Sequence, residues 1–480
     1  MLIFLIIFFP FVNKIFSSYI ILPFKKGNTS NNFLQSKFNI NIHTYMSIGE
    51  SKQKIKIYFR DEFFSFFILN KDVTYNEEEL NETQEYNINI INSYDLYDNA
   101  LSNTYKNFSD NKNFFIDIYY RKGYLSSESF YFNISNENNL KKFDDIEFVL
   151  VNKIKPNRTV ISGAIGLLVD EYFLEGTQNF GKMLVKKNVT KFCVWSKIYL
   201  NNENGIFIFG DYPHILYKDK FHKEQYIETD IKLNPYKQKW NINFDEIYFK
   251  NDLGNNNDNS KYFYLNTTLY GELMHNLGLI IGTVEYKNLI ENIFFDDYID
   301  NNICKKNKIL INNFFDKKIN YIYYSCNNAS FDKSQFPNLF LKQNDLKYIF
   351  ELNSNDLFAL YNNEWYFLVI FETEETANIN HKWFFGEPLL KKYQFVFDPI
   401  NYKIGFYNSL IPILNKEEKS KDNNIIKGMN YRQIGYYGII LLFLTIIILI
   451  IYNKLVRKNY FRKENNQSYT ELQNLIVNKS

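Results

Sequence analysis

An uncharged stretch of 19 residues, Ile434–Tyr452, is the feature that most restricts how this chain can be organised. A helix of about 20 apolar residues crosses the hydrocarbon core of a bilayer and satisfies its own backbone there. Five lysine and arginine residues follow within 454–463, and such residues favour the cytosolic side of a membrane. We therefore predict a transmembrane helix at 434–452, preceded by a stalk at 408–433 and followed by a cytoplasmic tail at 453–480.

The N-terminus carries a shorter apolar run, Leu2–Phe9, which is followed by Pro10. A run of this length matches the core of a secretory signal peptide and is too short to span a bilayer. We predict a signal peptide at 1–19, with a buried strand or an uncleaved anchor as the alternatives. Together with the C-terminal helix, it predicts a single-pass type I membrane protein in the secretory pathway, with a luminal or extracellular ectodomain.

The composition between these ends argues against several classes of function. The net charge is +2 and no basic stripe is present, so we expect no nucleic-acid partner. The chain has 5 histidines and 3 cysteines in no zinc-type spacing, and it lacks a glycine-rich phosphate loop, so we expect no metal and no cofactor. Short segments rich in β-branched and aromatic residues, with few amphipathic helices, predict a mostly β fold.

One segment, Tyr45–Leu69, carries a recognisable pattern. An Ile-Gly turn leads to Gln53 and then to a strand with alternating apolar residues, Ile55, Ile57 and Phe59. This resembles the first active-site strand of the pepsin-like aspartic proteases, in which an Ile-Gly-Thr-Pro-x-Gln turn precedes a strand that ends in Asp-Thr-Gly. Counted from Gln53, Arg60 holds the position of the catalytic aspartate.

Further segments resemble the same family and occur in the family's order. They are the hydrophobic-hydrophobic-Gly triplets in Ser162–Phe173 and Trp383–Gly386, and the strand-like runs Phe192–Leu200, Gly205–Gly210, Trp240–Ile247, Leu389–Asp398 and Lys403–Phe406. The resemblance covers residues 40–407. It implies a mostly β, bilobal pepsin-like fold with an N-terminal lobe at 40–230 and a C-terminal lobe at 231–407.

Residues 114–134 resemble the flap hairpin that closes over the substrate in this family. The resemblance makes Tyr119 or Tyr120 the flap tyrosine. The Gly-Ser-rich tip of the family is replaced here by Arg121 and Lys122. A shortened, charged tip is not suited to close over a peptide in the usual way.

The catalytic residues of the family are missing from the aligned positions. Aspartic proteolysis needs two carboxylates close enough to share one proton. In the second half, the run in register is Gly278–Tyr286, which has Gly282 in place of the second aspartate. A one-residue slip that placed Asp61 at the first position would invert the faces of its strand and would supply no second carboxylate. We expect Arg60 to lie in the cleft floor and to pair with an acidic group, for example Asp61 or Glu62.

The cysteines and glycosylation sequons agree with a secretory route. By resemblance to the disulfide region of the family's second lobe, we predict a bond between Cys304 and Cys326 in an oxidising lumen. Cys193 remains as a buried, small hydrophobic side chain. Asn-x-Ser/Thr sequons, which predict a glycoprotein, occur at Asn28, Asn81, Asn107, Asn133, Asn157, Asn188, Asn266 and Asn328.

These observations leave two main hypotheses. In the first, the chain is a membrane-anchored homologue of aspartic proteases that has lost both Asp-Thr/Ser-Gly motifs and binds a protein or peptide. In the second, it is a divergent aspartic endopeptidase of plasmepsin type whose dyad is built from other residues. No Asp-Thr-Gly or Asp-Ser-Gly triplet occurs in the chain, which favours the first. A third reading, an unrelated all-β adhesin, does not explain the ordered set of segments.

Overall fold

The structure is a computed structural model, and the residues it describes are 19–27, 32–38, 40–61, 63, 65–75, 96–108, 114–115, 122–134, 140–154, 161–169, 179–231, 239–250, 262–265, 269–312, 318–373 and 382–408. All of them belong to one compact unit, Met1–Pro412, and a second unit comprises Ile413–Ser480. The predicted transmembrane helix, the tail, nearly all of the stalk and nearly all of the signal peptide lie outside the described residues. Within the described ranges, no helix is long and apolar enough to span a bilayer.

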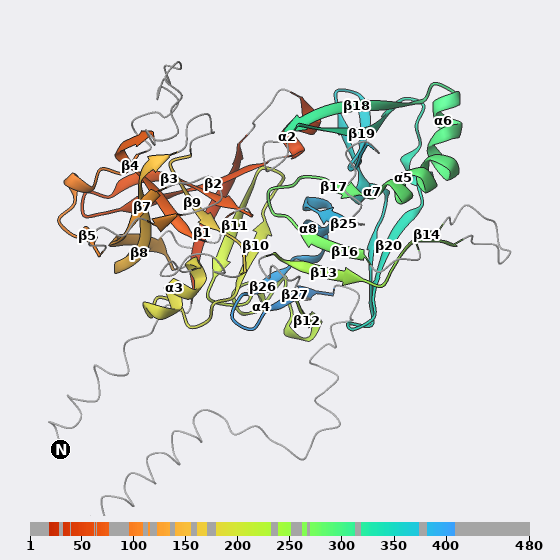
Figure 1. Cartoon of the computed structure of the whole chain (residues 1–480). Coiled ribbons are helices and arrows are strands. Elements are labelled where there is room, and N and C mark those ends of the chain that lie inside the picture. Colours follow the sequence, from red (N-terminus) through yellow and green to blue (C-terminus); the bar gives the residue numbers. More distant parts are fainter. Residues whose placement is uncertain are drawn as a thin grey trace, which may run out of the picture. The chain divides into compact units, whose positions relative to one another are not determined.

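Strands make up most of the described residues, as the composition predicts. The largest sheet has 14 strands in the order β12-β27-β26-β10-β11-β1-β2-β3-β9-β4-β8-β7-β5, with β6 paired to β7 (Figure 1). Its strands are β1 Ile20–Gly27, β2 Asn41–Ile48, β3 Gln53–Arg60, β4 Phe66–Tyr75, β5 Lys106–Asn107, β6 Phe114–Phe115, β7 Lys122–Asn133, β8 Leu140–Ile154, β9 Gly163–Gly166, β10 Trp195–Tyr199, β11 Asn204–Phe209, β12 Tyr226–Asp230, β26 Val396–Asp398 and β27 Lys403–Tyr407. Because β1 precedes residue 40 and β26 and β27 follow residue 395, this sheet extends beyond the predicted range 40–230.

Two further sheets contain the other strands. A 9-stranded sheet has the order β13-β16-β25-β17-β24-β19-β23-β22, with β18 paired to β19, and a 4-stranded sheet has the order β15-β14-β20-β21. Their strands are β13 Asn241–Phe244, β14 Glu246–Lys250, β15 Tyr262–Leu265, β16 Leu269–Leu273, β17 Ile280–Gly282, β18 Cys304–Asn312, β19 Lys318–Asn327, β20 Asn338–Gln343, β21 Tyr348–Leu352, β22 Phe358–Tyr361, β23 Glu364–Phe367, β24 Val369–Glu372 and β25 Lys382–Phe385.

The helices of the described residues are short. They are α2 Phe33–Phe38, α3 Phe180–Lys186, α4 Pro213–Leu216, α5 Val284–Ile290, α6 Asp296–Asp300, α7 Ser354–Leu357 and α8 Glu387–Tyr393, with the 3-10 turns η3 Asn99–Leu101, η4 Lys223–Gln225 and η6 Lys333–Gln335 and the π-helical segment η5 Glu291–Phe295. None is long enough to be stable alone, so their stability depends on packing against the sheets.

Helix α8 occupies the first part of Leu389–Asp398, a segment whose sequence resembles closing strands. Pro388 lies in the first turn of α8, where its fixed φ and missing N–H are tolerated. Gln394 then adopts a left-handed conformation, with φ of 48°, and ends the helix. Only the last part of the segment, β26, is a strand.

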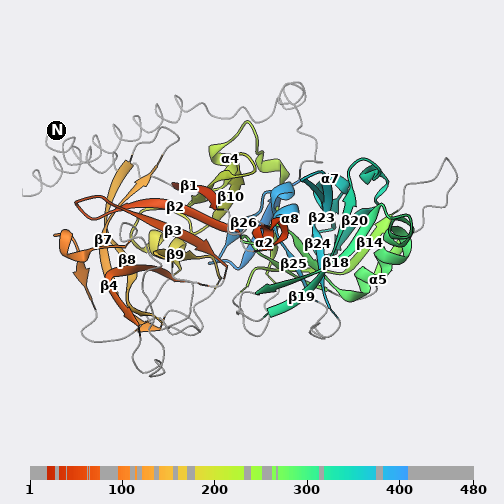
Figure 2. The ribbon, with the colours of Figure 1, turned by 90° about the horizontal axis from the view of Figure 1, so that it is seen from above.

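The strand β3 has the alternation that its sequence predicts. Ile55, Ile57 and Phe59 are buried on one face, and the side chains between them are more exposed. β3 runs parallel to β9, which runs antiparallel to β4, so that Ile165 of β9 lies opposite both Phe59 and Phe66 (Figures 1 and 2). The amide of the next residue, Gly166, donates to the carbonyl of Ser65 at 3.0 Å.

The 9-stranded sheet repeats this arrangement. β16 runs parallel to β25 and β25 runs antiparallel to β17, so that Phe385 lies opposite both Leu273 and Ile280. Gly386 donates to the carbonyl of Leu279 at 3.0 Å, as its equivalent does in the first sheet. Phe59 and Phe66 are seven residues apart in the chain, and so are Leu273 and Ile280. Each residue of the loop after β3 therefore has a counterpart in the loop after β16.

Candidate functional site

The loops that follow β3 and β16 meet at a buried, hydrogen-bonded pair. Asp61 follows β3 directly, and His275 and Asn276 follow β16. Nδ1 of His275 lies 2.8 Å from Oδ1 of Asp61, and the backbone N–H of Asn276 donates to Oδ2 of Asp61 at 2.8 Å. In the repeated arrangement Asp61 and His275 are counterparts. Two equivalent positions therefore join the 14-stranded sheet to the 9-stranded sheet.

Burial and charge together determine the ionisation of this pair. Asp61 is 7% exposed and His275 is 1% exposed. Burial alone raises the pKa of Asp61, but His275, the N–H of Asn276 and Lys197 outweigh it, and the pKa of Asp61 lies below its usual value. Burial, together with the charge of Lys197, lowers the pKa of His275 by more than Asp61 raises it. At neutral pH the pair is an ionised carboxylate that accepts from a neutral imidazole protonated on Nδ1.

The unprotonated nitrogen of this imidazole has a different environment. Nε2 of His275 is buried and has no hydrogen-bond partner among the described residues. The ring centroids of Trp195 and Phe397 lie 4.9 Å and 4.8 Å from that of His275. These apolar rings surround the imidazole and account for the effect of burial on its pKa.

A chain of charged side chains continues from the pair, with Lys197 and Glu387 buried and Lys26 half-buried. Lys197 of β10 donates from Nζ to the carbonyl oxygen of His275 at 3.0 Å, and it lies 3.8 Å from Oε1 of Glu387 in α8. Lys26 of β1 lies 2.6 Å from the same oxygen. Burial lowers the pKa of Lys197 to about 7, although Glu387 opposes this effect. Both lysines come from the 14-stranded sheet, whereas Glu387 follows β25, so these ion pairs also connect the two large sheets.

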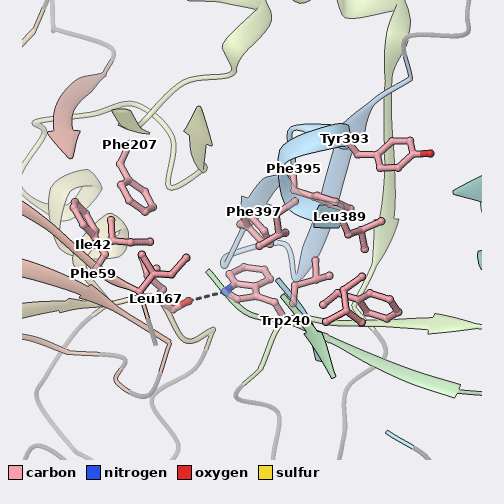
Figure 3. Packing of buried hydrophobic residues seen from close by; sticks show 14 of the residues in the cluster. Ile42, Phe59, Leu167, Phe207, Trp240, Leu389, Tyr393, Phe395 and Phe397 are labelled. Carbon is pink, nitrogen blue, oxygen red and sulfur yellow. Dashed lines mark hydrogen bonds between the residues drawn. The ribbon is translucent and has the colours of Figure 1, made fainter. Parts of the chain in front are cut away.

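Trp240, the residue before β13, packs beside this junction. Its Nε1 donates to the carbonyl oxygen of Leu167, just after β9, at 2.6 Å (Figure 3). Its ring centroid lies 4.9 Å from that of Phe397, in β26. The Trp240 side chain is 2% exposed, so the hydrogen bond satisfies an indole N–H that has no access to water.

The strand register corrects the sequence alignment that paired Arg60 with Gly282. Gly282 ends β17, and β17 corresponds to β4 rather than to β3. The counterpart of Arg60 is Met274, which follows β16 directly and is 3% exposed. The run that contains Gly282 is apolar, but it forms the second outer strand of the repeat and not the first.

Arg60 itself lies at the end of β3 and is 9% exposed. Its Nη2 donates to Oδ1 of Asn41 at 2.8 Å, and its guanidinium lies over the ring of Tyr58, 5.6 Å from the centroid. Asp61, one of the two acidic partners expected for Arg60, forms its hydrogen bonds with His275 and Asn276. The other, Glu62, lies outside the described residues.

The remaining predicted residues lie away from this junction or outside the described residues. The predicted flap tyrosine, Tyr119 or Tyr120, lies outside the described residues, and β6 and β7 on either side of it pair antiparallel. The predicted disulfide is confirmed, and Cys304–Cys326 joins β18 to β19. Cys193 is free and buried, as predicted. Over the described ranges, no three His, Cys, Asp or Glu side chains are arranged to hold a metal ion.

Sequence reasoning missed His275, Asn276, Lys197 and Glu387. A signal for the first two was present, because the apolar runs on either side of His275 have the same spacing as those on either side of Asp61. No local pattern distinguishes Lys197 or Glu387, since each is a single charged residue in or beside an apolar segment.

No family model and no curated protein matches this chain. Function is therefore inferred from the geometry of the junction. Chemically, the junction offers one ionised carboxylate, one neutral imidazole and a buried lysine. Two carboxylates that share a proton, as aspartic proteolysis requires, are not part of the described junction.

Proposed function

We propose that this chain is a catalytically inactive protein with the bilobal pepsin-like fold, and that its ectodomain binds a protein or peptide. In that fold two similar lobes bring two equivalent loops together. The repeated arrangement of β3-β9-β4 and β16-β25-β17 supports this proposal, because it brings Asp61 and His275 together from equivalent positions. The 14-stranded and 9-stranded sheets would form the cores of the two lobes.

The inactive assignment rests on the residues of the two equivalent loops. Arg60 and its counterpart Met274 would hold the positions of the two catalytic carboxylates, and Asp61, the residue after Arg60, is bonded to His275. In an aspartic protease, one carboxylate activates water while the second, protonated carboxylate polarises the substrate carbonyl. Here both oxygens of Asp61 accept hydrogen bonds from the opposite loop, and the equivalent loop supplies an imidazole. A neutral imidazole protonated on Nδ1 stabilises the ionised carboxylate but does not share a proton with it as a second carboxylic acid does.

We also propose that the binding domain is held at a membrane. The uncharged segment 434–452 and the basic residues that follow it support a single-pass type I arrangement, in which the described residues face the lumen or the cell exterior. The disulfide Cys304–Cys326 agrees with an oxidising compartment.

A proteolysis assay separates the proposed function from the alternative, an active aspartic endopeptidase. The full chain in detergent micelles is incubated with an unfolded protein substrate from acidic to neutral pH, beside the matched variant Asp61→Asn. We expect no cleavage in either sample. Cleavage by the wild-type chain that the Asp61→Asn variant lacks would overturn the inactive assignment.

A binding assay tests the positive half of the proposal. The folded full chain is immobilised and exposed to a displayed peptide library, with the heat-denatured chain as control. We expect a restricted set of peptides to be retained by the folded chain alone. Equal retention by the folded and denatured chains would contradict a binding function.

A further inference from the structure

Helix α2 packs against the 9-stranded sheet, although the strands on either side of it in sequence belong to the 14-stranded sheet. β1 and β2, on either side of α2, both belong to the 14-stranded sheet. The buried side chains of α2, Leu34 and Phe38, are each 1% exposed. They lie in an apolar cluster whose other buried members come from the 9-stranded sheet and its connecting loops, among them Leu277, Tyr321 and Ile370.

The backbone of the α2 segment also bonds to the loop after β16. The N–H of Gly278 donates to the carbonyl of Lys37 at 2.6 Å, and the N–H of Ile40 donates to the carbonyl of Asn276 at 2.7 Å. A Cβ on Gly278 would lie 3.0 Å from the Lys37 carbonyl oxygen, so glycine allows this close approach. This reciprocal bonding is what a main-chain recognition site provides for a peptide.

A third side chain extends the contact to the edge of the 9-stranded sheet. The ring of Phe33 stacks on Tyr361 of β22 at 4.9 Å and lies 4.9 Å from Tyr366 of β23. Phe38, on the buried side of the helix, lies 5.2 Å from the ring of Tyr321 in β19. α2 thus places an aromatic residue at each end and a leucine between them on one continuous apolar face.

We propose that the apolar surface of the 9-stranded sheet that α2 covers, which includes Leu277, Tyr321 and Ile370, is a peptide-binding site, and that α2 is its internal occupant. This inference builds on the proposed binding function and specifies the ligand. The ligand is a short helical peptide segment that carries a leucine and, one turn later, an aromatic residue, as Leu34 and Phe38 do. A helix of six residues has little stability of its own, so the site and not the helix maintains the conformation of α2.

The covalent connection of α2 determines how a partner reaches the site. A tethered segment competes at a high effective concentration, so a free peptide binds only to the fraction of molecules in which α2 is displaced. Weakening the apolar contacts of α2 raises that fraction. The same peptide must then bind more tightly, although the site itself is unchanged.

The test uses a fluorescent synthetic peptide with the sequence of residues 32–41 and the full chain in detergent micelles. The variant Leu34→Ser/Phe38→Ser weakens the internal occupant. Gln35→Ala, an exposed position on the same helix, is the matched control. We expect the peptide to bind the double variant at least about tenfold more tightly than the wild type, and Gln35→Ala to behave as the wild type does. A peptide with serine at its own leucine and second phenylalanine positions is expected not to bind.

A second measurement keeps the test decisive if the double variant does not fold. Excess peptide is added to the wild-type chain, and hydrogen exchange of the Ile40 amide is followed. We expect faster exchange, because displacement of α2 breaks the bond from Ile40 to Asn276. Unchanged exchange at saturating peptide, or dimers formed by exchange of α2 between two copies, would overturn the inference. If this peptide fails while library peptides still bind the folded chain, the inference is wrong and the proposed function stands.

Discussion

Replacing Asp61 by alanine tests whether the two large sheets depend on the buried pair between them. The change leaves Nδ1–H of His275 and the N–H of Asn276 as buried donors without an acceptor. A buried donor left without an acceptor costs about 1–3 kcal/mol, so the two donors together cost about 2–6 kcal/mol. We therefore expect Asp61→Ala to lower the free energy of unfolding by about 2–6 kcal/mol, a large part of the stability of an ordinary domain.

The assay is a urea titration of the full chain in detergent, followed by tryptophan fluorescence, because the Trp195 ring lies 4.9 Å from that of His275. In the double variant Asp61→Ala/His275→Ala both partners are absent. Its loss of unfolding free energy should therefore be smaller, by about 0.5–3 kcal/mol, than the sum of the losses of the two single variants. Asp72→Ala, an exposed aspartate in β4, is the control and should change stability by less than about 0.5 kcal/mol. A loss for Asp61→Ala no greater than that of Asp72→Ala, or strict additivity, would refute the reasoning.

Two further predictions concern pH and the disulfide. The pKa of Lys197 is lowered to about 7, and the pKa of His275 is also lowered, so the folded state binds fewer protons than the unfolded state below the ordinary pKa of each group. Stability should therefore decrease as the pH falls from about 10 to about 7, because of Lys197, and again below about 6.5, because of His275. A urea midpoint that does not change with pH would contradict this prediction. So would a decrease in stability below about 6.5 that the variant His275→Gln does not reduce. Removing the disulfide with Cys304→Ser/Cys326→Ser should lower the free energy of unfolding by roughly 3 kcal/mol, and a reductant should do the same to the wild type but not to the variant.

Local patterns were sufficient to predict several parts of the fold. The alternation of Ile55, Ile57 and Phe59 predicted the strand β3 and its buried face, because side chains of a strand alternate between two sides whatever the rest of the chain does. The Cys304–Cys326 bond, which was predicted from a family resemblance rather than from a local pattern, is also confirmed. By contrast, no local pattern predicted α2, because a six-residue helix exists only through the sheet on which it packs.

The sequence by itself determined the mostly β character of this protein and the absence of an Asp-Thr/Ser-Gly triplet, because strand propensity and residue identity are local properties. Only the tertiary structure decided which residues meet. Parallel pairing connects residues far apart in the chain, and no Asp-Thr/Ser-Gly triplet marks either β16 or β17 as the first outer strand, so the register could not be read from either run alone. That register makes His275 the partner of Asp61, and burial of the pair then determines its ionisation.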